Sequence, residues 1–473
     1  PERDFPERHP GGFKRTLMEK AKNKIDMLNG SLWNKILLFA IPIAASNILQ
    51  QLFNSADAAV VGRFSGSQAL AAVGSNGPII NIIISLFVGI SLGANVVIAN
   101  LIGAGKKQQI QNAVHTTITF ALIAGFALIF IGWFIAKPFL EFIKTPEDVI
   151  NLAALYLRIY FMGMPFFMLY NFGSSILRSK GDTKRPLFAL IISGIINVLL
   201  NLLLVIVFKL GVAGVAISTV IATGASSFLV ISFLIKETDE LHLDIKKLGL
   251  NTQLLSKMLK TGIPSGLQSI LFALSNLIVQ SSINSFGSKA MAGSASELNY
   301  ELFSYYVVLA FNMATTSFTS QNLGAQKFER CRKVNSLCIF FGIIFTGIMD
   351  FIFVFFREFF IQIYTTDPEA IKFGVLRMLV VVSFQWLVAT YEISGATIRA
   401  AGHPMIPAAL SILFICVFRV FWVKRIFPFS EFIPVLKDFS KWTSLLAVYP
   451  LSWIMTGIAM IAAYILIAKK TYN

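Results

Sequence analysis

One acidic residue stands in a long apolar segment near the start of the chain. Asp57 lies within "LQQLFNSADAAVVGRF" and is the only charged residue between Ile36 and Gly62. A carboxylate at bilayer depth costs roughly 2.5–3.5 kcal/mol on insertion scales, so such residues usually serve ion or substrate movement. Gln50 and Asn54 precede Asp57 on a similar helical face. An acid flanked by amides should face a water-filled cavity, where it could take up H⁺ or ligate Na⁺.

Amide side chains recur at helical spacing in two further apolar segments. Asn197 and Asn201 are four residues apart in "IINVLLNLLL", and Gln268, Asn276 and Gln280 follow one another at steps of eight and four. Residues at this spacing share a helix face, where amides can bind a neutral or cationic group without adding charge. The same amides could instead join neighbouring helices, at roughly 0.6–2 kcal/mol per hydrogen bond in a membrane. The spacing leaves both interpretations open.

Three glutamates lie in later apolar segments. Glu297 and Glu301 are four residues apart and so share a helix face. Glu392 precedes Arg399 by seven residues, about two helical turns. Each glutamate either pairs with a basic residue or faces a cavity that attracts cations. The candidate substrate-cavity residues are therefore the polar residues of these segments, namely Gln50, Asn54, Gln268, Asn276, Gln280, Glu301 and Glu392.

The composition indicates an all-α integral membrane protein. Of 473 residues, 56% are hydrophobic and 14% are charged, whereas soluble domains carry about 25% charged residues. The net charge is +16, but no basic stripe interleaved with aromatic residues is present, so we expect no nucleic-acid partner. The three cysteines and four histidines show no paired spacing or catalytic clustering. We therefore expect no enzyme and no bound cofactor.

The apolar segments predict twelve membrane spans, because a span needs about 20 apolar residues. Loops after even-numbered spans are basic, as in "RSKGDTKR" at 178–185, and loops after odd-numbered spans are mixed or acidic, as in "KTPEDV" at 144–149. This bias places both termini on the cytoplasmic side of a bacterial inner membrane. The predicted spans are 36–62, 70–102, 112–136, 149–177, 187–208, 211–235, 256–285, 290–322, 334–356, 371–398, 405–424 and 442–467.

The chain contains an internal repeat. "IGAGKK" at 102–107 recurs as "LGAQKF" at 323–328, and "LRSKGDTKRP" at 177–186 recurs as "IRAAGHPMIP" at 398–407, both at an offset of 221. Two more matches, "IP" at 41–42 with 263–264 and "TPEDVI" at 145–150 with "DPEAIK" at 367–372, have an offset of 222. Four matches in one order are a strong repeat signal. Because each repeat holds six spans, the halves should be related by a pseudo-two-fold axis along the membrane normal. The predicted parts are a polar segment 1–30, an N-lobe 31–235, a cytoplasmic linker 236–254 and a C-lobe 255–473.

Several motifs resemble the multidrug and toxic compound extrusion (MATE) family over almost the whole chain. They are "LQQLFNSADAAVVGRF", "GAGK" at 103–106, "RSKGDTKRP" after the fourth span and "FTSQNLGAQ" ending the eighth. The resemblance implies two six-helix lobes that open alternately, with export driven by Na⁺ or H⁺. It places Asp57, Asn197 and Asn201 at the N-lobe cation site, as the residues that would bind Na⁺ or a proton. Asn201 stands where the family often has Asp, and the seventh span has no acid.

Together these patterns predict a secondary antiporter that exports amphipathic organic cations in exchange for Na⁺ or H⁺. We expect it to act as a monomer surrounded by membrane lipids, with no cofactor besides the coupling ion. The alternative is a flippase for a lipid-linked oligosaccharide, because proteins of that kind also have paired six-helix lobes. A strongly positive central cavity would favour the flippase, since its substrate carries phosphates.

Overall fold

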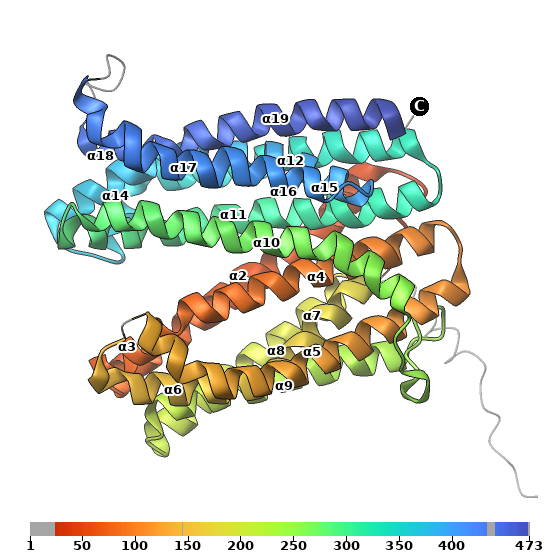
Figure 1. The fold of residues 1–473 in the computed structure, drawn as a ribbon, viewed down its shortest axis with the longest axis horizontal. Helices are drawn as coiled ribbons and strands as arrows, with labels where there is room; N and C mark the ends of the chain where they lie inside the picture. The colour runs from red at the N-terminus through yellow and green to blue at the C-terminus, as the bar shows by residue number, and fades with distance from the viewer. Residues whose placement is uncertain (1–23, 144, 433–439, 472–473) are drawn as a thin grey trace, which may run out of the picture.

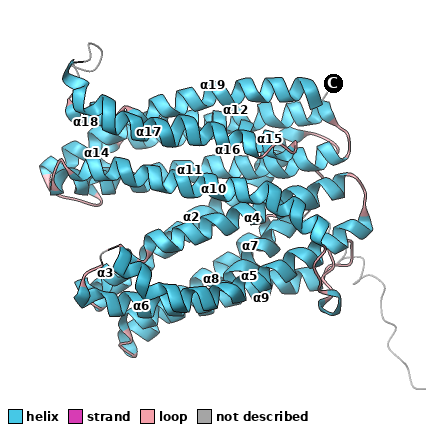
Figure 2. Cartoon of the chain, viewed as in Figure 1, coloured by secondary structure: helices cyan, strands magenta, loops and turns pink. Residues whose placement is uncertain are grey.

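Every element in the part of the chain that the structure describes is a helix (Figure 2). The computed structural model describes residues 24–143, 145–432 and 440–471. The first half contains α2 (Leu32–Phe64), α3 (Ser67–Ser75), α4 (Gly77–Gly103), α5 (Lys107–Phe142), α6 (Glu147–Met162), α7 (Met164–Ser179), α8 (Lys184–Asn201), η1 (Leu202–Val207) and α9 (Gly211–Ile235). The absence of strands from the described ranges confirms the predicted all-α fold class.

The second half of the chain follows a short linker helix, η2 (Ile245–Lys247). Four long helices begin it, α10 (Thr252–Asn284), α11 (Ser288–Gly324), α12 (Phe328–Phe355) and, after α13 (Arg357–Gln362), α14 (Pro368–Val380). Another helical segment is made of η3 (Val382–Leu387) and α15 (Val388–Ala400). The last elements are α16 (Met405–Ser411), η4 (Ile412–Val417), α17 (Phe418–Phe421), η5 (Trp422–Ile426), η6 (Phe427–Phe432), α18 (Lys441–Leu446) and α19 (Val448–Thr471).

The long helices account for the twelve predicted spans. Within the described ranges, ten segments are long and apolar enough to cross a membrane, and the pair α6 and α7, bent by 47°, makes an eleventh. Pro165 contributes to this bend, since proline lacks the N–H that would bond to the preceding turn. The remaining predicted span is α11, which has 37 residues but buries polar side chains such as Thr315, Thr316 and Gln321. Its polarity reflects a position inside the protein.

The helices form two lobes with separate hydrophobic cores (Figure 1). The N-lobe core gathers residues of α4, α5, α7, α8 and α9, and the C-lobe core gathers residues of α11, α12, α15 and α19. The first helix of each half crosses between the lobes. Ile36 and Phe39 of α2 lie in the C-lobe core, whereas Leu254 and Met258 of α10 lie in the N-lobe core. Movement of one lobe must therefore displace the first helix of the other half.

The lobes pack most closely at one end of the molecule, here called the linker end, which carries residues 24–30 and the linker 236–251. Gly103 of α4 lies against the carbonyl oxygen of Gln321, and Gly324 of α11 lies against the carbonyl oxygen of Asn100. A Cβ atom at either glycine would overlap that backbone. Each pair maps onto the other at an offset of 221, so the contact follows the pseudo-two-fold axis. At the opposite end, α3 and α14 stand apart in Figure 1.

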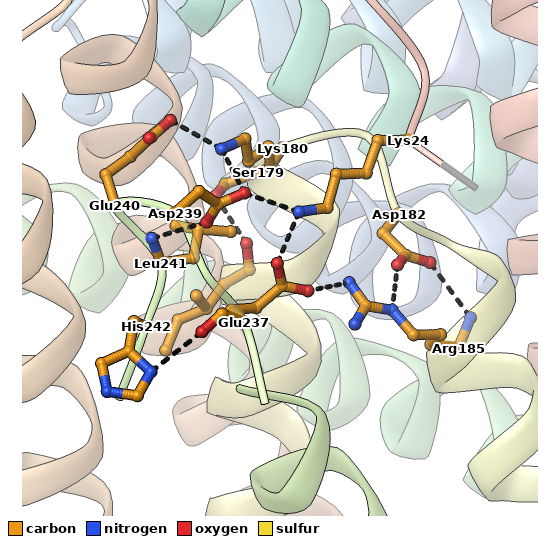
Figure 3. A network of polar contacts seen from close by, with 11 residues as sticks. Lys24, Ser179, Lys180, Asp182, Arg185, Glu237, Asp239, Glu240, Leu241 and His242 are labelled. Carbon is orange, nitrogen blue, oxygen red and sulfur yellow. Dashed lines mark hydrogen bonds and ion pairs between the residues drawn. The ribbon is translucent and has the colours of Figure 1, made fainter. Parts of the chain in front are cut away.

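Residues 24–30 join the two lobes at the linker end. On the N-lobe side, Lys24 Nζ lies 2.6 Å from a carboxylate oxygen of Glu237 and 2.7 Å from one of Asp239 (Figure 3). Lys180 Nζ also contacts Asp239, at 2.7 Å. Burial alone would raise the pKa of Asp239, but hydrogen bonds from Lys180 and Lys24 hold it well below its ordinary value. On the C-lobe side, Arg330 donates to backbone carbonyls of this segment.

Candidate functional site

The structure brings Asp57, Asn197 and Asn201 together inside the N-lobe. Asn201 Nδ2 donates to Asp57 Oδ1 at 2.5 Å and lies 3.3 Å from Asn197 Oδ1. The hydroxyl of Thr219, on α9, lies 3.3 Å from Asp57 Oδ2 and 2.9 Å from the carbonyl oxygen of Val215. Three helices thus hold one carboxylate among neutral partners, and we call these four polar side chains (Asp57, Asn197, Asn201 and Thr219) the Asp57 cluster.

The backbone changes immediately after Asn201. Asn201 is the last residue of α8, and the chain continues as the π-helical turn η1 from Leu202. A π-helical turn rotates the following side chains relative to a regular helix, and such turns are frequent at functional sites. Asn197, four residues earlier, faces the same way as Asn201 because of the helical period. Both asparagines are buried.

The chemistry of the Asp57 cluster is that of a site for a proton or a small hard cation. No Lys or Arg in the described ranges lies within ion-pairing distance of Asp57. The amide oxygen of Asn201 is buried without a hydrogen-bond partner in the same ranges, although buried acceptors are normally paired. An unpaired amide oxygen beside a carboxylate suits a proton donor or a cation that prefers oxygen ligands.

A second site is a cavity of about 220 Å³ between the lobes, here called the interlobe cavity. Its charged residues are Arg178, Glu392 and Arg399. Asp57 does not line it, and Gln50, which does, lies seven residues earlier on α2, about two helical turns away. The other lining residues are Ser46, Asn47, Gln50, Val88, Gly89, Ser91, Leu92, Tyr170, Asn171, Ser265, Gln268, Ser269, Phe272, Tyr305, Leu309, Asn312 and Met313.

Three of the seven predicted cavity residues line this cavity. Gln50 and Glu392 face it from opposite lobes, and Gln268 lines it while donating to Ser411 Oγ at 3.2 Å. Glu392 is buried and accepts a hydrogen bond of 2.6 Å from Asn312 Nδ2.

The other four predicted residues lie elsewhere. Asn54 is exposed on α2, and Gln280 donates to Asn284 at 2.9 Å on an exposed face. Asn276 accepts a hydrogen bond of 2.5 Å from Arg419. Glu301 is paired with Arg377 at 2.9 Å. The spacing had left open whether Asn276 and Glu301 line a cavity or join neighbouring helices. The structure shows that both join neighbouring helices.

Sequence reasoning did not single out Thr219, Arg178 or Arg399 as site residues. Thr219 lies in an apolar segment with other hydroxyl residues, and nothing in its spacing distinguishes it. Arg178 and Arg399 occupy equivalent positions in the repeated segments "LRSKGDTKRP" and "IRAAGHPMIP". Their equivalence in the repeat could have identified them from the sequence, because two arginines related by the repeat should lie near the symmetry axis between the lobes.

Comparison with known proteins places this architecture in a family. A family model named MatE matches residues 42–203 and 264–422, one segment in each lobe. The chain belongs to the MatE family. The resemblance read from the motifs is thereby confirmed, and the family's proteins are transporters, consistent with the expectation of a non-enzyme.

Individual MatE relatives match most of the chain. The probable multidrug resistance protein YoeA of Bacillus subtilis is 31% identical over 389 residues, which cover 81% of this chain and 84% of that protein. An FAD transporter of Shewanella oneidensis is 25% identical over 396 residues, which cover 81% of this chain and 86% of that protein. The structure of a MATE transporter of the MOP superfamily in its outward-facing conformation shares the fold, with a TM-score of 0.87 at 20% identity over 95% of this chain and 98% of that one.

Proposed function

We propose that this MatE-family protein is a secondary active antiporter that exports amphipathic organic cations in exchange for H⁺ or Na⁺. The observation that carries the proposal is the Asp57 cluster, a membrane-depth carboxylate whose partners are all neutral. A buried carboxylate that only stabilised the fold would be expected to have a basic partner. Glu297 of the C-lobe has one in Arg377. A carboxylate left free of such a partner can exchange an ion.

The path of α2 offers a way to couple the two sites. Its first half packs in the C-lobe core, its middle lines the interlobe cavity at Gln50, and its second half carries Asp57 into the N-lobe. Binding of the coupling ion would change the charge of Asp57 and its hydrogen bond to Asn201. We propose that this change shifts α2 against α8 and so favours one of two lobe arrangements.

The substrate class follows from the interlobe cavity and the relatives. Glu392 supplies a buried negative charge beside Arg178 and Arg399, and Tyr170, Tyr305 and Phe272 supply aromatic faces that attract organic cations. YoeA is named a multidrug resistance protein, which supports a drug-like substrate. A lipid-linked oligosaccharide flippase ranks second, because a cavity for phosphates alone would not be expected to contain a carboxylate.

The proposal extends to the setting of the protein. The linker end carries Lys106, Lys107, Lys180, Lys246 and Lys247, so we propose that it faces the cytoplasm of a bacterial inner membrane. The exposed large apolar residues of the outer helices, such as Phe134, Phe228 and Phe351, would contact membrane lipids. We propose a monomer, because each lobe has its own core and the candidate sites lie within one chain.

Transport into liposomes tests this proposal. Purified protein is reconstituted, and ethidium movement is followed under a Na⁺ gradient alone and a proton gradient alone. Asp57→Asn keeps the size of the side chain and removes its charge, so we expect gradient-driven transport to fall at least tenfold. Asp148→Asn, at an acid on α6 outside both sites, is the matched control and should transport normally. Full gradient-driven transport by Asp57→Asn would exclude Asp57 as the coupling residue.

A further inference from the structure

We infer that Arg178 and Arg399 form an anion-binding pair in the interlobe cavity, and that the preferred substrates are zwitterionic amphiphiles carrying an acidic group as well as a cation. This inference rests on the proposed function for the direction and purpose of binding. It goes further by assigning a second recognition site within the cavity and the chemical group that it takes.

The two arginines are equivalent by the repeat and converge on one cavity. Arg178 is near the end of α7 in the N-lobe, and Arg399 is near the end of α15 in the C-lobe, at an offset of 221. Both line the interlobe cavity. Arg178 Nη1 lies 3.7 Å from the sulfur of Met313, and Arg399 Nη2 lies 3.4 Å from Asn312 Oδ1. Two consecutive residues of α11 therefore contact the two guanidinium groups, which come from opposite lobes.

Neither guanidinium has a direct ion pair, although Glu392 lies close enough to Arg399 to act on it electrostatically. Within the described ranges, no carboxylate lies within 4 Å of Arg178 or Arg399. The Nε atoms of both are buried without a hydrogen-bond partner there, and Arg399 is only 4% exposed. Arg377 shows the usual arrangement for a buried arginine, with two glutamates and a serine as partners. A buried guanidinium with open donor positions is costly unless a ligand completes it.

The charges of the cavity define the ligand. Two arginines and one glutamate leave it with a net charge of +1 when Glu392 is ionised. Guanidinium groups present paired donors that match the oxygens of a carboxylate or phosphate. Glu392 lines the same cavity and could contact a cationic group. A purely cationic substrate would use Glu392 and leave both arginines unpaired, whereas a zwitterion satisfies both signs of charge.

The cavity is smaller than the roughly 300–1,000 Å³ of typical ligand sites, at about 220 Å³. We infer that it holds the charged head of the substrate in this arrangement of the lobes. Because one arginine comes from each lobe, an anionic group that contacted both would join the lobes.

A matched pair of dyes tests the inference. Rhodamine B carries a carboxylate and a delocalised cation, and its ethyl ester keeps the fluorophore and the cation but lacks the acid. Fluorescence polarisation with detergent-purified protein gives the Kd of each dye without any gradient. We expect the wild type to bind rhodamine B at least tenfold more tightly than the ester. The double variant Arg178→Gln/Arg399→Gln should lose this preference while its Kd for the ester changes less than threefold.

Two further variants separate recognition from structure. Arg178→Lys/Arg399→Lys keeps the charge without the paired donors, so it should retain a reduced preference for the acid. Arg158→Gln removes an N-lobe arginine that stacks on Trp133 outside the cavity and should leave the preference unchanged. The inference is overturned if the wild type binds both dyes equally, if the double Gln variant keeps the preference, or if it loses both dyes alike.

The transport assay keeps this inference separate from the proposed function. If ethidium moves under a gradient and the two rhodamines bind alike, the anion-binding pair is wrong and the antiporter proposal stands. If ethidium does not move but the acid is preferred, the anion-binding pair stands and the proposal of organic-cation export fails.

Discussion

The two lobes share one internal repeat yet place different partners around their buried acids. The residue equivalent to Asp57 in the C-lobe, at an offset of 222, is Val279, which is fully buried in the C-lobe core. The N-lobe holds one carboxylate among amides and a hydroxyl. The C-lobe instead holds Glu297 and Glu301 in contact with Arg377. In the C-lobe these two glutamates share one guanidinium, whereas Asp350 and Glu392 are buried and, like Asp57, have no ion pair in the described ranges.

This difference indicates which charges serve function and which serve the fold. Arg377 stabilises the charged form of the two glutamates that it contacts, and removing its charge would leave both of them uncompensated. Arg377 also lies 5.3 Å from the ring of Tyr449, which is 4.5 Å from Arg419, so the group is part of the C-lobe packing. The Asp57 cluster has no such counter-charge and can change its protonation at lower cost.

The largest expected effect comes from removing the counter-charge in the C-lobe. Arg377→Gln would leave two buried glutamates without their cation, and breaking a buried pair in this way typically costs about 3–5 kcal/mol. We expect a strong loss of thermal stability in detergent. The triple variant Glu297→Gln/Glu301→Gln/Arg377→Gln removes every charge of the group and should recover much of the loss. If Arg377→Gln were as stable as the triple variant, the stabilities of these three charged residues would not depend on one another.

The next effect would come from transferring the N-lobe acid to the C-lobe. Val279→Asp places a carboxylate at the repeat-equivalent position, but Trp422 and Phe418 stand there in place of Asn201 and Asn197. Without amide partners the new acid should cost roughly 2.5–3.5 kcal/mol, the value for a central membrane carboxylate. Asp57→Asn, in contrast, should change the melting temperature little. Normal stability of Val279→Asp would argue that the amides around Asp57 are not needed to hold a carboxylate.

Much of the fold and part of the site follow from sequence alone. Mean hydropathy marks spans wherever lipid-facing residues dominate, and the period of the helix puts Asn197 and Asn201 on one face. The partner of Glu301 could not be predicted, because Arg377 is 76 residues away and the contact depends on how α11 packs against α14. The repeated segments around Arg178 and Arg399 suggest loops. In the structure both residues lie in the last turns of helices, α7 and α15, and line the cavity.

The smallest expected effect concerns how each lobe holds residues 24–30. The N-lobe holds Lys24 through carboxylates, whereas the C-lobe holds this segment through donors to backbone carbonyls, such as Asn322 Nδ2 to Met27 at 3.1 Å. Lys180 and Lys24 lower the pKa of Asp239 in the folded protein. Its stabilisation is therefore present above the ordinary pKa, about 3.9, and is lost as the pH falls towards the folded-state value.

Asp239→Asn should lower stability by about 1 kcal/mol or less at pH 7, as expected for partly exposed ion pairs. Its difference from the wild type should shrink below about pH 4, where Asp239 takes up a proton in the unfolded wild type but stays ionised in the folded protein. Asn322→Ala removes a neutral hydrogen bond on the C-lobe side, so its effect should not change with pH over this range. Melting curves of both variants from pH 3 to 8 make the comparison. A difference for Asp239→Asn that grew on acidification would contradict the assigned ion pairs, because protonation can only remove the charge on which they depend.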